Sequence, residues 1–157
     1  MIGSQDILNF TEIDERLASS GQPMPEHFPI LAEEGFVALI NLATKASTGH
    51  LPVEPELCTK AGIEFTWQPV AWDAPTVEDY LAFQDWLDAH RHSKVLVHCA
   101  MNWRASLFCA LYRVVREGLS PAKAWEEVLE VWEPDEVWST LARKVLTQAC
   151  PGVAPFF

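Results

Sequence analysis

One stretch of the chain constrains its fold more than any other. An apolar run from Val95 to Val97 ends abruptly in His98 and Cys99, and Arg104 follows five residues after the cysteine. A long apolar segment without a further turn signal comes next. The pattern predicts a buried strand, a short tight loop and a buried helix. Such a loop aims several backbone N–H groups and a helix N-terminus at one point, which makes a binding site for an anion.

The rest of the chain alternates strand and helix patterns. The unbroken apolar run at 36–42 is typical of a central parallel strand, and residues 63–70 alternate like a strand with one wet face. Prolines, glycines and capping residues bound the elements. In the first part of the chain we expect a strand with a turn at 17–23, a helix at 25–34, a strand at 36–42, a loop at 44–55 and a helix at 56–61. A strand at 63–70, a loop at 71–75 and a helix capped by Thr76 and Asp79 should follow. The strand before Cys99 and helices at 104–117, 121–132 and 136–149 are expected to complete the chain.

This order predicts a single α/β domain over residues 1–157, with a mostly parallel central sheet of four to five strands flanked by helices. Residues 1–16 are expected to form an arm or a short first strand. The helices of 120–157 are expected to cover one side. The length is that of one ordinary domain with a substantial core.

Charge and composition limit the classes of partner that the chain is expected to bind. The formal net charge of −11 argues against nucleic acid and anionic membranes, since both require basic surface. We expect a phosphorylated substrate of unknown class. Its phosphate, or a similar oxyanion, is expected to bind in the loop, at a local positive site. Signal-peptide and membrane-span patterns are not seen, and four scattered cysteines fit a reducing cytoplasm. Neither the cysteines nor the histidines have metal-ligand spacing, so no metal and no cofactor are expected.

The loop residues point to nucleophilic chemistry. A basic neighbour, a nearby arginine and a helix N-terminus favour the thiolate form of a cysteine, and His98, Arg104 and the following helix offer these to Cys99. Asparagine tolerates the positive φ that such a loop needs at Asn102. The Arg104 fork suits two oxygens of a phosphoryl or sulfuryl group. Ser106 is expected to stabilise the thiolate as a leaving group. The expected phosphate-binding residues are Ala100, Met101, Asn102, Trp103, Arg104 and Ala105.

The segment from His98 to Ser106 resembles the signature loop of cysteine-dependent phosphatases, the tyrosine and dual-specificity superfamily. With the segments 17–23 and 35–43 in the same order, the chain resembles a bacterial branch related to the accessory domain of beta-lactamase-hydrolase-like proteins. The likeness covers about residues 17–119. It implies a protein-tyrosine-phosphatase-like fold and hydrolysis of a phosphate monoester through a cysteinyl-phosphate on Cys99.

Phosphoryl transfer also requires an acid that protonates the departing oxygen. Dual-specificity phosphatases carry it as an aspartate on the loop before the helix that precedes the signature strand. In this sequence Asp73 has that place, between Trp72 and Pro75. The alternative is an ordinary turn residue, as in most Asp-x-Pro sequences. Trp125, Trp132 and Trp138 fit helical stripes and are expected in the core.

The loop departs from the phosphatase pattern in three ways. Four residues instead of five separate Cys99 from Arg104, Asn102 takes the place of a glycine, and Ala105 precedes Ser106. The shorter loop is also the length found in rhodanese-like sulfurtransferases. Three functions therefore stay open: a phosphatase, a sulfurtransferase that carries a persulfide on Cys99, and a phosphate-binding module with weak turnover. Asp73 discriminates between the two enzymes, because sulfur transfer needs no such acid.

Overall fold

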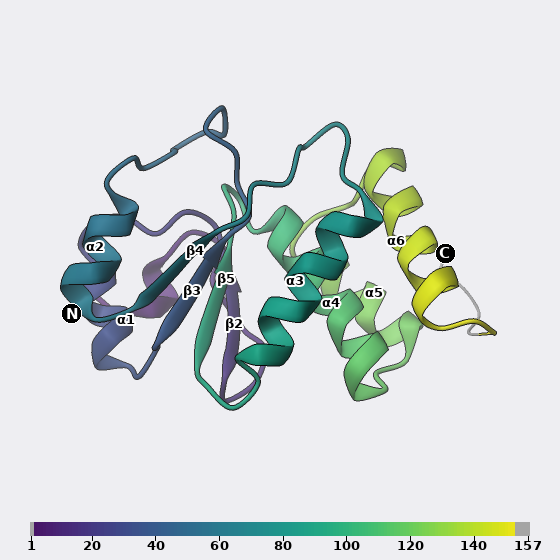
Figure 1. Cartoon of the computed structure of the whole chain (residues 1–157), viewed down its shortest axis with the longest axis horizontal. Helices are drawn as coiled ribbons and strands as arrows, with labels where there is room; N and C mark the ends of the chain where they lie inside the picture. The colour runs from purple at the N-terminus through teal and green to yellow at the C-terminus, as the bar shows by residue number, and fades with distance from the viewer. Residues whose placement is uncertain (1, 153–157) are drawn as a thin grey trace.

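The computed structural model describes residues 2–152 and contains a five-stranded sheet with the order β1-β2-β5-β3-β4 (Figure 1). Only β1 is antiparallel to its neighbour, so the sheet is mostly parallel, as predicted. The strands are β1 (Thr11–Glu12), β2 (Leu17–Ser20), β3 (Ala38–Asn41), β4 (Glu64–Trp67) and β5 (Val95–His98). The helices are a short 3-10 turn η1 (Ser4–Asp6), α1 (His27–Glu33), α2 (Glu54–Ala61), α3 (Val77–Ala89), α4 (Trp103–Glu117), α5 (Pro121–Leu129) and α6 (Glu136–Ala149).

Two apolar cores cover the two faces of the sheet. Because successive side chains of a strand point to opposite faces, Val95 and Val97 face one core and Leu96 faces the other. The first core lies under α3, α4, α5 and α6, and the second lies under α1 and α2. Figure 1 shows these two groups of helices on opposite sides of the sheet. Both faces of β5 are therefore buried, which explains its unbroken apolar sequence.

Several boundaries differ from the sequence-based expectation. Helix α2 begins at Glu54 rather than at residue 56, because Pro55 is accommodated in the first helical turn, where its missing N–H costs nothing. Helix α5 ends at Leu129, before Trp132, and α1 begins two residues after Pro25. Strand β4 covers only Glu64–Trp67 at the edge of the sheet, and both its terminal residues are exposed.

The N-terminal arm is more ordered than an irregular segment. It contains η1 and β1, and β1 pairs with β2. Ile7 is buried in the second core. The arm therefore belongs to the packed structure and reaches the carboxyl end of the sheet through the residues between η1 and β1.

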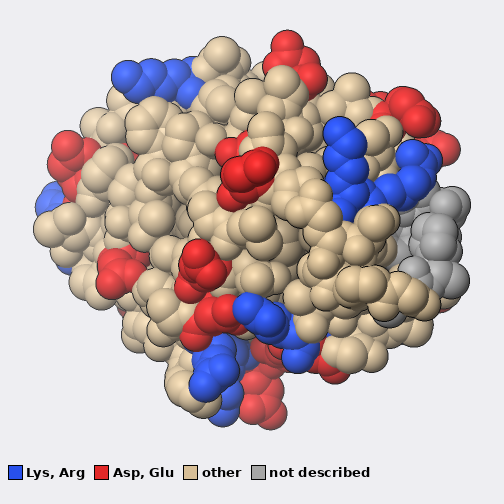
Figure 2. Space-filling model, turned by 45° about the vertical axis from the view of Figure 1, so that its right-hand side comes forward, with Lys and Arg blue, Asp and Glu red and all other residues tan. Residues whose placement is uncertain are grey.

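The surface is acidic but not uniformly so. On the face shown in Figure 2, lysine and arginine side chains lie in small separate groups among carboxylates. No helix within residues 2–152 is long and apolar enough to cross a membrane.

Candidate active site

Cys99 lies directly after β5, at the carboxyl end of a strand that is flanked by β2 and β3. Its amide donates to the carbonyl of Ser20 at 3.3 Å, and the amide of Leu42 donates to the carbonyl of His98 at 2.8 Å. The Cys99 residue is only 1% exposed. The cysteine is thus fixed by both neighbouring strands, at the edge where parallel sheets present their ligand sites.

The loop after Cys99 turns sharply into α4. Asn102 is the N-cap residue of this helix with φ of 70°, so the predicted positive φ is confirmed. Its side-chain Nδ2 donates to the carbonyl of Asn9 at 2.8 Å, and Nδ2 of Asn9 donates to the carbonyl of Met101 at 3.0 Å. The N-terminal arm therefore holds the loop from outside, a contact that the sequence did not indicate.

Gly21, directly after β2, supports the same loop. The amide of Gln22 donates to the carbonyl of Ala100 at 3.0 Å. A Cβ atom at Gly21 would lie 2.7 Å from that carbonyl oxygen, closer than side-chain atoms approach. The glycine after Ser20 is thus required by the close approach of two backbones.

Arg104 extends from the first turn of α4 into the site and is 5% exposed. One terminal nitrogen donates to the carbonyl of Val70 at 2.9 Å, and the other donates to Oγ of Ser47 at 3.1 Å. Its Nε is buried and has no hydrogen-bond partner among residues 2–152. The guanidinium carbon lies 5.6 Å from the ring centre of Trp72. The two terminal nitrogens hold the side chain in place, while the N–H on Nε has no partner among residues 2–152.

A hollow of about 290 Å³ lies between Cys99 and Arg104. Its wall is formed by residues that carry a thiol, a guanidinium, hydroxyls, indoles and small apolar groups: Thr44, Ala46, Ser47, Thr48, Trp72, Cys99, Ala100, Met101, Trp103 and Arg104. The described residues that line it include no carboxylate. The structure therefore brings the predicted nucleophile and the predicted cation into one cavity.

Four tryptophans build one side of this region. The ring of Trp72 lies 5.6 Å from that of Trp103, 5.5 Å from that of Trp132 and 5.4 Å from that of Trp138. Nε1 of Trp138 donates to the carbonyl of Trp72 at 2.9 Å. Trp138 is fully buried, as expected, whereas Trp132 is half-buried and stacks on Trp103. The C-terminal helices thereby contact the wall of the hollow.

Five of the predicted site residues do not line this hollow: Asp73, His98, Asn102, Ala105 and Ser106. Asp73 is exposed and lines a separate depression with Pro75, Glu136 and Lys144. The hydroxyl of Ser106 donates to the carbonyl of Trp103 at 3.1 Å. Ser106 also faces a different hollow, between β2, α4 and α5. Asn102 and Ala105 are fully buried within the loop and the first helical turn.

A buried, hydrogen-bonded pair, His98 and Glu54, lies beside the backbone of Cys99. Nε2 of His98 lies 2.5 Å from Oε2 of Glu54, and Nδ1 lies 3.1 Å from the carbonyl of Cys99. Oε1 of Glu54 accepts from Nδ2 of Asn41 at 3.1 Å and from Nε2 of Gln22 at 3.3 Å. Burial, together with the charge of Glu54, raises the pKa of the Cys58 thiol to about 12. The only sequence signal for Glu54 was an acidic residue before Pro55.

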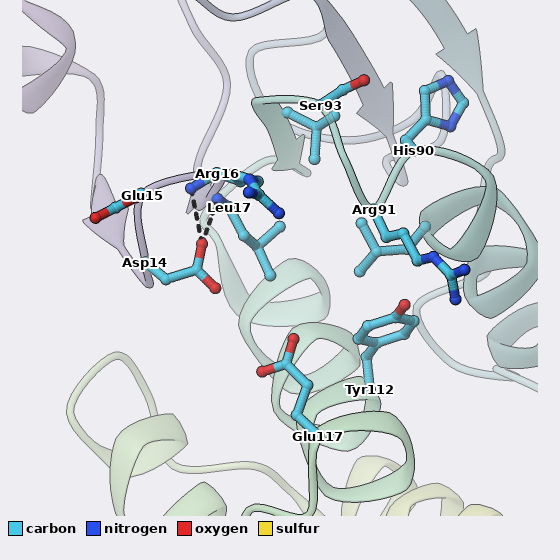
Figure 3. A pocket seen from close by; sticks show the side chains of 11 residues that line it. Asp14, Glu15, Arg16, Leu17, His90, Arg91, Ser93, Tyr112 and Glu117 are labelled. Atoms are coloured by element: carbon cyan, nitrogen blue, oxygen red, sulfur yellow. Dashed lines mark hydrogen bonds between the residues drawn. The ribbon is translucent and has the colours of Figure 1, made fainter.

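A second hollow, about 390 Å³, lies at the opposite, amino ends of β2 and β5 (Figure 3). Its lining has charges of both signs, including Arg16, Arg91 and Glu117. Oδ1 of Asp14 accepts from the amides of Arg16 and Leu17 at 2.8 and 2.9 Å. This hollow contains no thiol, so the predicted chemistry belongs to the cavity at Cys99. No group of three or more potential metal ligands is found within residues 2–152.

Comparison with known proteins identifies relatives of this chain. No family model matches. A beta-lactamase hydrolase-like protein of Xylella fastidiosa is 33% identical over 111 residues, which cover 69% of this chain and 26% of that protein. One from Agrobacterium fabrum is 33% identical over 96 residues, covering 59% of this chain and 22% of the relative. The chain thus spans about a quarter of the length of these curated relatives.

Two solved structures are similar to this chain over most of its length. The crystal structure of a "Putative phosphatase (DUF442)" from Shewanella putrefaciens is 34% identical, with a TM-score of 0.83, and the match covers 92% of this chain and 95% of that one. Tk-PTP in its active form matches with a TM-score of 0.76 at 24% identity over 87% and 95% of the two chains, which shows a shared fold. The predicted fold is therefore confirmed. The chain belongs to the DUF442 family of this Shewanella protein, is related over part of its length to beta-lactamase hydrolase-like proteins, and shares its fold with Tk-PTP.

Proposed function

We propose that this protein hydrolyses a phosphate monoester through a cysteinyl-phosphate intermediate on Cys99. The observation that carries the proposal is the buried Nε of Arg104, which lacks a partner within residues 2–152 while its guanidinium lines the same hollow as Cys99. An unsatisfied buried donor costs about 1–3 kcal/mol, and an oxyanion in the hollow would supply the missing acceptor. The names of the Shewanella relative and of the tyrosine-phosphatase-like neighbours support this function.

The reaction proceeds by two displacements. The thiolate of Cys99 attacks phosphorus, a sulfur–phosphorus bond forms, and the bond to the ester oxygen breaks. Arg104 and backbone amides of residues 100–105 hold the three remaining phosphoryl oxygens, since the first amides of a helix have no partner within it. Asp73 protonates the leaving oxygen. Water then attacks phosphorus, Asp73 accepts its proton, and phosphate and free thiolate result.

The acid role of Asp73 requires movement of residues 71–75, because Asp73 is exposed and does not line the hollow. Trp72 in the same loop already does, so the displacement needed is local. A substrate with a good leaving group, such as an aryl phosphate, depends least on this proton transfer. Asp73→Asn should therefore slow hydrolysis of an alkyl phosphate more than that of a nitrophenyl phosphate.

The Cys99→Ser variant tests the central step. Hydrolysis of an aryl phosphate should fall to background, because the serine hydroxyl is a far weaker nucleophile than a thiolate. Binding of inorganic phosphate or vanadate should persist, since Arg104 and the loop amides are retained. Unchanged turnover in the Cys99→Ser protein would contradict the proposal.

A rhodanese-like sulfurtransferase is the second candidate, favoured by the four-residue spacing between Cys99 and Arg104. Thiosulfate-to-cyanide sulfur transfer, measured beside aryl phosphate hydrolysis on the same protein, separates the two. We expect hydrolysis without sulfur transfer. The converse result would establish the sulfurtransferase, and oxyanion binding with neither activity would establish a binding module.

A further inference from the structure

The ends of three neighbouring strands converge on one buried carboxylate, that of Glu54. Asn41 ends β3, His98 ends β5, Gln22 follows β2, and each of their side chains contacts Glu54. The side chain of Glu54 is 2% exposed and that of His98 is 0% exposed. Glu54 is also the first residue of α2, where the helix dipole stabilises a negative charge. A buried carboxylate is costly unless it is fully paired, and this one is paired on both oxygens.

The hydrogen bonds of His98 define where its protons lie. Nδ1 faces the carbonyl oxygen of Cys99, which can only accept, so Nδ1 must carry a hydrogen. Nε2 faces the carboxylate of Glu54, and one further proton lies between these two atoms. Wherever that proton is placed, the ring donates from Nδ1 to the backbone of the nucleophile. The carboxylate therefore fixes both the orientation and the tautomer of the imidazole.

We propose that Glu54 is a positioning residue for Cys99: through His98 it holds the Cys99 carbonyl, and with it the start of the phosphate-binding loop, in the geometry needed for attack. This inference rests on the proposed role of Cys99 as a nucleophile. The imidazole thus lies between the carboxylate of Glu54 and the backbone carbonyl of Cys99. Among residues 2–152, Cys58 on α2 is a further titratable group that feels the charge of Glu54.

The removal of the carboxylate has a defined consequence. In Glu54→Gln the imidazole can accept a hydrogen bond from the amide, so it becomes neutral while Nδ1 still donates to Cys99. The shared proton is then lost, and with it the charge-assisted character of the hydrogen bonds through which His98 holds the Cys99 carbonyl.

The test compares Glu54→Gln with Glu56→Gln, which makes the same charge change in the same helical turn at an exposed position. The rate of Cys99 alkylation by iodoacetamide is followed by mass spectrometry at about pH 6.5 and about pH 9. Glu54→Gln should slow alkylation about tenfold at the lower pH, the effect of a one-unit displacement of the pH profile, and much less at the higher pH. Glu56→Gln should match the wild type at both.

The same proteins are then assayed with a nitrophenyl phosphate. Glu54→Gln should lower kcat on the order of tenfold with little change in KM, because Arg104 and the loop amides are untouched. Alkylation does not require turnover. If the wild type fails to hydrolyse phosphate esters while alkylation still responds to Glu54, the proposed function fails and the positioning role stands.

A double-mutant cycle shows whether the effect passes through His98. In the His98→Asn background, Glu54→Gln should change alkylation by less than about twofold, since its intermediary is gone. If Glu54→Gln does not fold, judged by thermal unfolding, Glu54→Asp withdraws the same carboxylate by one methylene and should give a smaller loss in the same direction. The inference is overturned if a folded Glu54→Gln or Glu54→Asp protein shows the alkylation profile of the wild type. It is also overturned if Glu54→Gln has its full effect in the His98→Asn background.

Discussion

Asn102 and Gly21 show how single residues shape the Cys99 loop from its two sides. Asn102 supplies the positive φ at which α4 begins, and its amide joins the loop to the N-terminal arm. Gly21 has no such dihedral requirement. It is needed because the carbonyl of Ala100 leaves no room for a Cβ atom. One residue is selected for its conformation and the other for its lack of a side chain.

Gly21→Ala should therefore displace the loop. The added methyl group would meet backbone atoms of Ala100, which cannot move without moving the phosphate-binding amides. Overpacking of this kind costs about 1–3 kcal/mol, so we expect that loss in the free energy of unfolding in urea. Vanadate inhibition of aryl phosphate hydrolysis should weaken at the same time.

Gly3→Ala is the matched control, because the nearest atoms to its added methyl belong to the flexible end of the exposed Gln5 side chain. It should leave vanadate inhibition unchanged. Equal inhibition of the Gly21→Ala and Gly3→Ala proteins would show that the close contact with Ala100 does not shape the anion site.

The sequence predicted the parts of the site that lie together in the chain. Cys99, Asn102 and Arg104 occur within six residues, so strand, loop and helix patterns place them without tertiary information. Ser47 and Trp72 reach the site from loops that no periodicity describes. Glu54 was assigned to the loop at 44–55, whereas α2 begins at Glu54 and holds Pro55 in its first turn, where proline is well tolerated. Contacts between distant segments require the folded chain.

At the scale of elements, Asp88 joins α3 to α4. Oδ1 accepts from the hydroxyl of Tyr112 at 2.8 Å and from Nε of Arg116 at 3.2 Å, and Oδ2 accepts from Arg116 at 3.0 Å. Burial alone would raise the pKa of Asp88. Hydrogen bonds from Arg116 and Tyr112 outweigh it, so the pKa of Asp88 lies below its ordinary value of 3.8. Burial, together with the hydrogen bond to Asp88, raises the pKa of Tyr112 to about 12.

This link predicts a stability that depends on pH. Because the pKa of Asp88 is lower in the folded protein, the unfolded chain binds more protons below about pH 4, and the contribution is lost as the pH falls through the folded value. Asp88→Asn should thus be less stable than the wild type at about pH 7, by at most about 1 kcal/mol for a partly exposed pair. The difference should shrink towards about pH 2.5.

Urea unfolding of both proteins at the two pH values provides the measurement. Asp85→Asn, an exposed change on the same helix, is the control and should follow the wild type. A stability gap between Asp88→Asn and the wild type that stays constant with pH would mean that side-chain packing, rather than the charge of Asp88, joins the two helices.

At the scale of the whole molecule, the net charge of −11 opposes Arg104, the one cation among residues 2–152 that lines the Cys99 hollow. Basic groups elsewhere lie in small separate groups on the face shown in Figure 2. A phosphate ester therefore approaches a molecule that repels it at long range and attracts it only near Arg104. Salt screens the long-range repulsion more strongly than the short-range attraction near Arg104. The reason is that the Debye length falls from about 30 Å at about 0.01 M salt to about 8 Å at about 0.15 M.

Raising the salt concentration over this range should remove most of the long-range repulsion while leaving the buried contact with Arg104 largely intact. We expect kcat/KM for a nitrophenyl phosphate to rise about two- to fivefold, the reverse of the fall seen when a charged substrate is steered towards an oppositely charged surface. The salt must have an anion that does not compete for the site.

Alkylation of Cys99 by neutral iodoacetamide serves as the control and should change little, whereas alkylation by anionic iodoacetate should rise with salt. A fall of both kcat/KM and the iodoacetate rate would mean that the field at the mouth of the hollow is already positive, and that Arg104 outweighs the acidic surface at the distance where substrate is captured.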